Sequence, residues 1–273
     1  MIGPMPAVLR VIHPAPATAV VLLSAALGAI LATQAGVPIG EGWGLTVLAV
    51  AGSQVFTGAT NDIADRVRDA AARPEKPIPA GELSLNAATW LASVGLAVQL
   101  AASWRTGGPA LALGAIASGS ALAYNLALSR TPFSPLPYLV SFGLLPAWIA
   151  AGVGVPLERV LPAIPLVAPF AVAAHLANTL RDFQADAAGG SRSLAQVLGR
   201  TASRRLAAGL ALAVGLGVGG ALMIGGRATA WSIGLGLIGL LAVAQGTLSD
   251  RRLWYGVLVA AVCWTAAWAL STA

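Results

Sequence analysis

Two acidic segments stand out in an otherwise apolar chain, and both follow the pattern N-x-x-x-D-x-x-x-D. One occupies residues 61–69 and the other residues 178–186. Residues four apart lie on one face of a helix, so each segment is expected to present one amide and two carboxylates as a single stripe. The two predicted stripes are Asn61, Asp65 and Asp69, and Asn178, Asp182 and Asp186.

Two carboxylates one helical turn apart need a compensating charge. At a separation of about 5–6 Å and an effective dielectric near 20, they repel by about 3 kcal/mol. Local arginines offer one compensation, because Asp62 precedes Arg66 by four residues and Asp65 precedes Arg68 by three, although such exposed pairs contribute little. Mg²⁺ offers the other, because it prefers oxygen ligands and leaves positions for substrate phosphate. The repetition of the spacing favours metal binding, with the two stripes facing each other across a cavity.

The composition indicates a multi-spanning membrane protein. The 273 residues are 57% hydrophobic and 10% charged, with a mean hydropathy of +0.80, whereas a soluble domain carries about 25% charged residues. The net charge of +6 comes from basic residues scattered between apolar runs, so we expect no nucleic-acid partner. The single cysteine, Cys263, excludes an internal disulfide and a cysteine-based metal site.

The apolar runs are each long enough to cross about 30 Å of hydrocarbon. They predict an all-α membrane protein with nine transmembrane helices. No linker or low-complexity segment divides the chain, so residues 1–273 are expected to form a single domain. The predicted spans are 14–35, 42–60, 84–104, 109–128, 135–155, 160–180, 203–224, 229–248 and 253–271.

The charges between these spans predict the orientation. Nine spans place thirteen of the sixteen Lys and Arg residues on the side of the N-terminus; the exceptions are Arg105, Arg159 and Arg227. Cytoplasmic loops carry the excess of basic residues, so the N-terminus is expected in the cytoplasm. Eight of the ten acidic residues share that side, all but Glu41 and Glu158. The chemistry is therefore expected at the cytoplasmic surface of the cell membrane.

Four motifs occur along the chain: residues 61–69 read N-D-x-x-D-x-x-x-D, residues 73–81 read R-P-x-K-P-I-P-x-G, and D-x-x-x-D and G-x-R-S-L follow at 182–186 and 190–194. Together these motifs resemble the UbiA superfamily of intramembrane prenyltransferases. The resemblance covers essentially the whole chain, and nine helices also match it. It implies a helical bundle around a central cavity, where the two acidic motifs bind Mg²⁺ and a prenyl diphosphate.

The resemblance also implies roles for individual residues. One metal site would use Asn61, Asp62, Asp65 and Asp69, and the other would use Asp182 and Asp186. The catalytic group would comprise Asp65, Asp69, Asp182, Asp186 and Arg130. The substrate-binding group would comprise Asn61, Arg66, Arg73, Lys76, Tyr124, Asn178, Arg192 and His175. For each basic residue taken singly, anchoring at the membrane surface is the alternative.

The segment from Tyr124 to Arg130 departs from the family pattern. Ala127 and Ser129 stand where relatives often carry lysine, so Arg130 alone is left to pair with an acceptor carboxylate or a diphosphate oxygen. The type of acceptor is therefore open.

Two histidines lie close to the predicted spans. His175 lies seven residues before Asp182, on roughly the same helical face, and has two interpretations. It would accept a proton or steady a cation, or it would bond to a neighbouring helix. His13, next to Pro14, is expected at the membrane interface.

Three functions are compatible with these features. The first is Mg²⁺-dependent transfer of a prenyl group from a prenyl diphosphate to an aromatic or other lipophilic acceptor. The second is a terpene cyclase of the same superfamily, which needs no acceptor and is mildly favoured by the missing lysines. The third is a transporter, which would place acids along a path through the bilayer. The clustering of acids on one side argues against the transporter.

Overall fold

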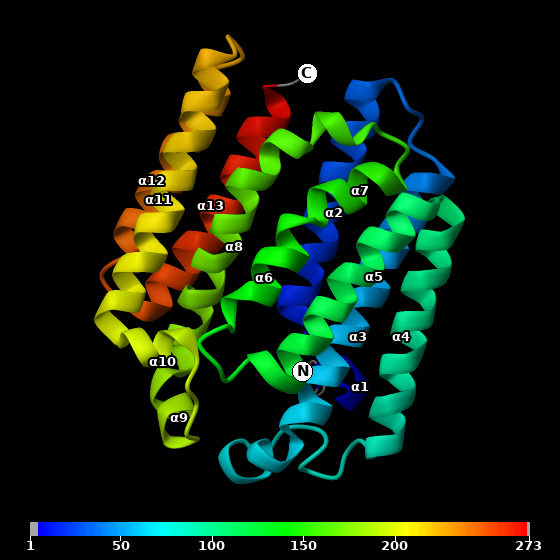
Figure 1. The fold of residues 1–273 in the computed structure, drawn as a ribbon, viewed down its shortest axis with the longest axis vertical. Coiled ribbons are helices and arrows are strands. Elements are labelled where there is room, and N and C mark those ends of the chain that lie inside the picture. Colours follow the sequence, from blue (N-terminus) through cyan, green and yellow to red (C-terminus); the bar gives the residue numbers. More distant parts are fainter. Residues whose placement is uncertain (1–4, 272–273) are drawn as a thin grey trace. The chain divides into compact units, whose positions relative to one another are not determined.

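The computed structural model describes residues 5–271, and within these residues the chain is helical without strands. Figure 1 labels the helices. The chain divides into two compact units, each built from two pieces of sequence. Unit 1 holds the residues up to Ala127 together with Ala147–Pro156, and unit 2 holds Leu128–Pro146 and Leu157 onward.

Unit 1 contains the first five α-helices, most of the π-helical turn η1, and α7 from Ala147 onward. Proline and glycine set several of its helix ends. Pro14 begins α2, and Gly107, with a φ of +125°, ends α4 just before α5, which has Pro109 in its first turn. The bounds are α1 Ala7–Val11, α2 Pro14–Ala35, α3 Glu41–Ala72, α4 Leu85–Thr106, α5 Gly108–Ala123, η1 Tyr124–Leu128 and α7 Leu145–Gly152.

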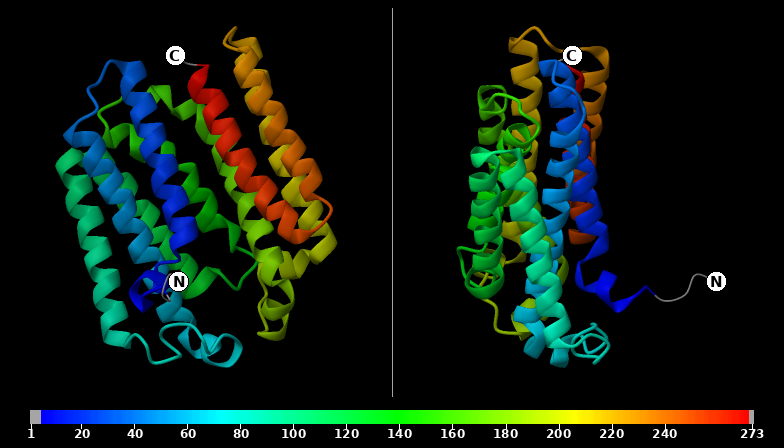
Figure 2. Two further views of the ribbon diagram at one scale, coloured as in Figure 1. Left: turned by 180° about the vertical axis from the view of Figure 1, so that it is seen from behind. Right: turned by 90° about the vertical axis from the view of Figure 1, so that its right-hand side faces the viewer.

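Helices α3 and α4 pack with their backbones in close contact. Gly52 of α3 lies against Gly95 of α4, and a Cβ atom placed on Gly52 would lie only 2.6 Å from the Gly95 carbonyl oxygen. Small residues allow this approach, as they do in membrane helices generally. The two helices run side by side in both views of Figure 2. This contact fixes α3, the helix that carries the first acidic motif.

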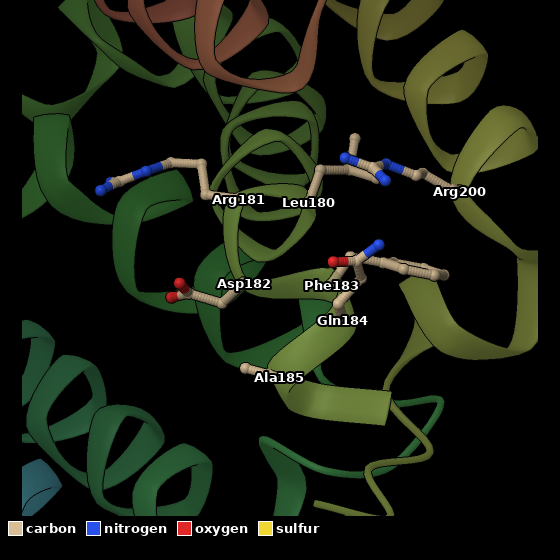
Figure 3. A pocket seen from close by; sticks show the side chains of 7 residues that line it. All are labelled: Leu180, Arg181, Asp182, Phe183, Gln184, Ala185 and Arg200. Atoms are coloured by element: carbon tan, nitrogen blue, oxygen red, sulfur yellow. The ribbon is translucent and has the colours of Figure 1, made fainter. Parts of the chain in front are cut away.

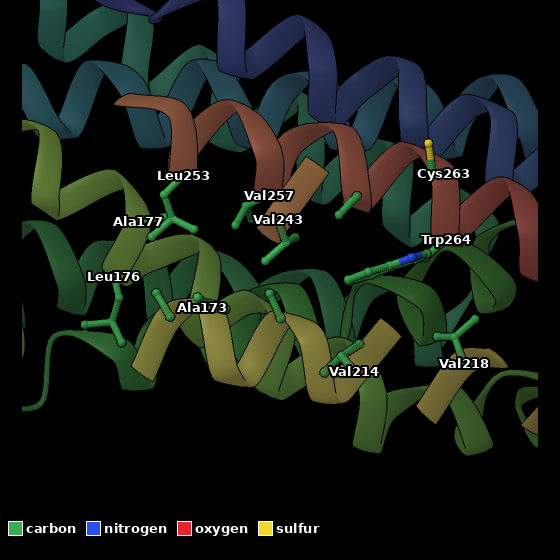
Figure 4. Close-up of a cluster of buried hydrophobic side chains, with 14 of the residues drawn as sticks. Ala173, Leu176, Ala177, Val214, Val218, Val243, Leu253, Val257, Cys263 and Trp264 are labelled. Carbon is green, nitrogen blue, oxygen red and sulfur yellow. The ribbon is translucent and has the colours of Figure 1, made fainter. Parts of the chain in front are cut away.

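Unit 2 is built mainly from four long helices around one apolar core. The indole of Trp264 lies over Gly215 and Gly239, which have no side chains to displace it, and its Nε1 donates to the Gly236 carbonyl at 3.2 Å. Figure 4 shows the cluster around Trp264. The bounds are α6 Pro135–Gly143, η2 Leu157–Arg159, η3 Leu161–Ala163, α8 Ile164–Thr179, η4 Leu180–Asp182, α9 Phe183–Ala188, α10 Leu194–Leu198, α11 Arg200–Ile224, α12 Ala230–Gly246 and α13 Asp250–Leu270.

Seven helical segments among the described residues are long and apolar enough to cross a membrane. Two of the nine predicted spans fall outside that set. The predicted span 42–60 lies within α3, which continues through the charged residues up to Ala72, and α12 has only 17 residues. The prediction of an all-helical, multi-spanning membrane protein is therefore confirmed, and the count of nine spans stays a prediction.

Candidate functional site

The first acidic motif forms the last turns of α3, so the helical stripe predicted for residues 61–69 has the helix it requires. The carboxylates of Asp62 and Asp69 are buried, with 2% and 6% of each residue exposed. Asn61 and Asp65 are half-buried, and Arg66 is exposed. Asp62 and Asp69 are seven residues apart, which is two helical turns, so they share one face of α3.

Lys76 joins the two buried carboxylates. The chain turns back after α3, and the Lys76 Nζ lies 2.9 Å from Asp62 Oδ1 and 2.8 Å from Asp69 Oδ2. His13 approaches Asp62 from the start of α2, with 3.1 Å between its Nε2 and the same Oδ1. The ammonium that was expected to hold phosphate thus bridges two acids of the motif and offsets one of their two negative charges.

These contacts determine the protonation of Asp62, which lies beyond the predicted span 42–60. Burial acts to raise the pKa of its carboxyl group. The hydrogen bonds from His13 and Lys76, together with the charges of these two residues, outweigh burial and leave the pKa below its ordinary value of 3.8. Asp62 is therefore a carboxylate at neutral pH.

The segment before α2 secures the loop that carries Lys76. Arg10 forms an ion pair with Glu82 at the end of this loop. Val11 is fully buried in a cluster with Phe56, Ala59 and Ala92. A Cβ atom on Gly58 would lie 2.8 Å from the Ile12 Cα, so glycine is needed for this close approach.

Asp65 and Asn61 have other partners. Asp65 forms an ion pair with Arg68 three residues later, one of the two local pairs considered from the sequence. The other, between Asp62 and Arg66, is replaced by the contacts to Lys76 and His13, and Arg66 donates instead to the Ile63 carbonyl at 2.9 Å. Asn61 donates through Nδ2 to Oδ1 of Asn125 at 3.2 Å.

The second motif does not form the continuous helical stripe expected from its spacing. Asn178 lies at the end of α8, Asp182 ends the 3₁₀ turn η4, and Asp186 lies in α9. A 3₁₀ turn has three residues per turn, so side chains four apart no longer lie one above another. The expectation of a stripe in this second copy was therefore wrong. Asp182 is exposed and Asp186 is half-buried.

A pocket of about 230 Å³ opens beside this second motif (Figure 3). The side chains of Arg181 and Asp182 point to the same side in Figure 3, away from Arg200. Arg181 also lies 5.6 Å from the centre of the Trp254 ring and 3.4 Å from Asn178 Oδ1. The lining residues are Leu180, Arg181, Asp182, Phe183, Gln184, Ala185 and Arg200.

Arg130 lies against the loop that carries Arg192. Its guanidinium donates to the Gly189 carbonyl, and its own carbonyl accepts from the Arg192 backbone N–H at 3.0 Å. The half-buried Arg130 and the exposed Arg192 are therefore neighbours, although they belong to two different loops. Tyr124 and Arg73 are both half-buried in unit 1.

His175 is fully buried in α8. Its Nε2 lies 3.0 Å from Ser134 Oγ, which also accepts from the Leu194 backbone N–H at 3.3 Å. The Tyr138 ring lies 4.6 Å away. The bond to a neighbouring element considered for His175 is therefore present, and its role toward substrate stays a prediction.

Two contacts of the first motif were not predicted. His13 was expected only at the membrane interface, and nothing in its local sequence indicates a partner 49 residues away. Asn125 had a usable signal, because an amide in an apolar run is costly unless it is bonded. It is 4% exposed and holds Asn61.

The atoms of the first motif that could bind a metal ion are oxygen atoms. In the described part of the chain, no three His, Cys, Asp or Glu side chains form a group that could hold a metal alone. Mg²⁺ does not require such a group, because it is commonly held by one or two carboxylates with water and substrate phosphate. The amide and carboxylate oxygens of Asn61 and Asp65 fit that preference.

Comparison with known proteins relates the chain to prenyltransferases. The model of the UbiA prenyltransferase family matches residues 21–253. A digeranylgeranylglyceryl phosphate synthase of Methanoculleus marisnigri (strain ATCC 35101 / DSM 1498 / JR1) is 32% identical over 159 residues, which are 57% of this chain and 55% of that protein. This match thus spans about half the length of that relative.

Solved structures share the fold at low identity. A UbiA homolog from Aeropyrum pernix K1 is 20% identical with a TM-score of 0.70, over 90% of this chain and 96% of that chain. A UbiA homolog from Archaeoglobus fulgidus bound to GPP and Mg²⁺ is 14% identical with a TM-score of 0.70, over 98% of this chain and all of that chain.

Proposed function

Because the chain belongs to the UbiA prenyltransferase family, we propose that it transfers a prenyl group from a prenyl diphosphate to an aromatic or other lipophilic acceptor and releases diphosphate. The observation that carries this proposal is the extent of the family match, which includes both acidic motifs. The Archaeoglobus fulgidus homolog bound to GPP and Mg²⁺ supports the class of donor and the metal.

The proposed Mg²⁺ ligands are Asn61, Asp65 and Asp69 of the first motif, with Asp62 beside them, and Asp182 and Asp186 of the second. All offer the hard oxygen atoms that Mg²⁺ prefers. When bound, Mg²⁺ supplies positive charge that makes diphosphate a competent leaving group.

The basic residues near the motifs would bind the diphosphate oxygens. Arg73 and Arg192 offer guanidinium forks, which suit phosphate geometry. A backbone hydrogen bond holds Arg130 beside Arg192, so both guanidinium groups would act on the same anion. Lys76 would have a different role, because its bonds to Asp62 and Asp69 order these two carboxylates and offset part of their negative charge before substrate arrives.

The membrane placement of the site is also part of the proposal. Nine spans with a cytoplasmic N-terminus would put both motifs on the cytoplasmic side, as the distribution of basic residues supports. The helices would form one domain around a central cavity that receives the prenyl chain from the bilayer. An apolar cavity would exclude the water that quenches an allylic cation.

A terpene cyclase is the second candidate. It would ionise the same diphosphate, and the resulting cation would react with its own double bonds. One observation favours it: Ala127 and Ser129 leave the segment after Tyr124 with Arg130 as its only basic residue.

Product analysis tests the two candidates. Purified protein with Mg²⁺ would be incubated with C10, C15 and C20 prenyl diphosphates, with and without membrane extract as the source of acceptor. A prenylated lipophilic product that forms only with extract supports the transferase. A cyclic hydrocarbon or alcohol formed without extract supports the cyclase, and no diphosphate release under any condition contradicts both.

A further inference from the structure

Asn125 holds the amide of Asn61 in a single orientation. Asn125 lies in the π-helical turn η1, and π-helical turns are frequent at functional sites. Its Nδ2 donates to the Thr57 carbonyl at 3.0 Å and to Thr60 Oγ1 at 2.8 Å, and its Oδ1 accepts from Asn61 Nδ2 at 3.2 Å. All four residues belong to unit 1.

The partners of Asn125 determine which end of its amide faces α3. The Thr57 carbonyl can only accept a hydrogen bond. Thr60 donates its own hydroxyl proton to the Phe56 carbonyl at 2.7 Å, so its oxygen is left to accept from Asn125. Both partners require the NH₂ group, and the Asn125 oxygen is therefore turned toward Asn61.

This orientation in turn determines the orientation of Asn61. An oxygen at Asn125 requires the NH₂ group of Asn61, so the Asn61 Oδ1 is turned away from Asn125. Within residues 5–271, no hydrogen bond to that Oδ1 is found, and the Asn61 side chain is half-buried. A carbonyl oxygen is a ligand for Mg²⁺, whereas an NH₂ group is not.

We propose that Asn125 is a positioning residue for the metal site. It acts through Asn61, whose amide it locks with the oxygen presented as a ligand. This inference rests on the proposed function. It concerns Asn125, which lies in neither of the two acidic motifs. A residue that orients a metal ligand commonly changes metal affinity or activity 10–100-fold when it is replaced.

The test measures Mn²⁺ affinity by electron paramagnetic resonance, with geranyl thiolodiphosphate as an uncleaved donor analogue. We expect Asn125→Ala to weaken Mn²⁺ binding about tenfold. Asn125→Leu, which keeps most of the volume, should do the same and serves if the alanine variant does not fold. With membrane extract as the source of acceptor, the Mg²⁺ concentration for half-maximal diphosphate release from geranyl diphosphate should rise in parallel.

Gln99 supplies a matched control. It is another buried amide of unit 1, and it donates to the Gly114 carbonyl at 2.7 Å and accepts from Ser118. Gln99→Ala removes a comparable link between helices and should change Mn²⁺ affinity less than about twofold, since it contacts no proposed ligand.

An Asn61→Asp background separates orientation from packing. A carboxylate presents an oxygen whichever way it is turned, so Asn125→Ala should change Mn²⁺ affinity less than about twofold in this background. An equal loss in both backgrounds, or unchanged affinity in the Asn125→Ala variant alone, would overturn the inference. If the unmodified protein neither binds Mn²⁺ with the analogue nor releases diphosphate, the proposed function itself fails.

Discussion

The Nε2 atom of His13 lies 3.1 Å from Oδ1 of Asp62, across 49 residues of sequence. His13 holds this position with a φ of +52°, and among the described residues it is the only non-glycine with a positive φ. A left-handed conformation costs such a residue about 1–2 kcal/mol. The contact of His13 with Asp62 and the packing of the preceding residue, Ile12, against Gly58 stabilise the conformation, so the start of α2 and the first motif are ordered together.

The lowered pKa of Asp62 predicts how acid affects the fold. In the pH range between the folded and unfolded pKa values, the unfolded chain binds more protons, so stability falls as pH falls through that range. We expect Asp62 to contribute stability fully above about pH 3.8, its ordinary pKa, and to lose it below. Thermal unfolding in detergent with EDTA, at a series of pH values, measures the contribution as the difference from Asp62→Asn.

The double variant His13→Asn Lys76→Met should reverse the direction in which the stability contributed by Asp62 changes with pH. Asparagine tolerates the left-handed conformation but does not reach Asp62. Burial would then act alone and raise the pKa of Asp62, so acidification from neutral pH should increase its contribution to stability. If the stability contributed by Asp62 changes with pH in the same direction in both proteins, His13 and Lys76 are not the cause of its lowered pKa.

Asp65→Asn and Asp182→Asn should each lower diphosphate release at least about 100-fold. Each change removes a negative oxygen from a proposed metal site and keeps the size of the side chain, so the protein should stay folded. Release of diphosphate from geranyl diphosphate, with membrane extract as the source of acceptor, and a thermal melt of each variant measure both effects. Glu75→Gln, which removes an exposed acid from the loop after α3, is the control and should keep most activity. Retention of most activity by both aspartate variants would contradict the metal assignment.

Local patterns in the sequence predicted the helices but not the contacts between them. Apolar runs bounded by Pro14 or Gly107 locate helix ends, because these residues restrict or free the backbone wherever they stand. The helix through the first motif followed from the same reasoning. The partners His13 and Asn125 did not, since periodicity carries no information on contacts across 49 or 64 residues.

The second motif shows a different limit of prediction from sequence. Its spacing equals that of the first, yet the chain changes from α-helix to a 3₁₀ turn at Leu180 and back at Phe183. No proline or glycine stands between Asn178 and Asp186 to announce the change. Equal spacing therefore predicts equal geometry only where the helix type is also the same.

Asp250→Ala should lower the stability of unit 2 by about 2 kcal/mol. The buried carboxylate of Asp250 accepts from Arg200 Nε at 2.6 Å and from Arg204 Nε at 2.7 Å, and these bonds join the start of α13 to α11. The arginines are partly exposed and would regain water, which limits the loss. Glu41→Ala breaks the exposed pair with Arg105 and should change stability by at most about 0.5 kcal/mol. Denaturant titration in detergent compares the two, and equal losses would contradict the importance of burial.

Gly52→Ala should destabilise unit 1 by about 1–3 kcal/mol, because the added methyl group has no space. A Cβ atom there would lie 2.6 Å from the Gly95 carbonyl oxygen and 2.8 Å from the Gln99 backbone nitrogen, both of which belong to the backbone of α4. The matched control is Gly44→Ala on the same helix, where nothing lies within 4 Å of the new methyl group. Alanine favours helix over glycine by up to about 1 kcal/mol, so this variant should be as stable as the parent or more so. Thermal unfolding measures both, and the interpretation of a tight contact between α3 and α4 fails if the two variants melt at the same temperature.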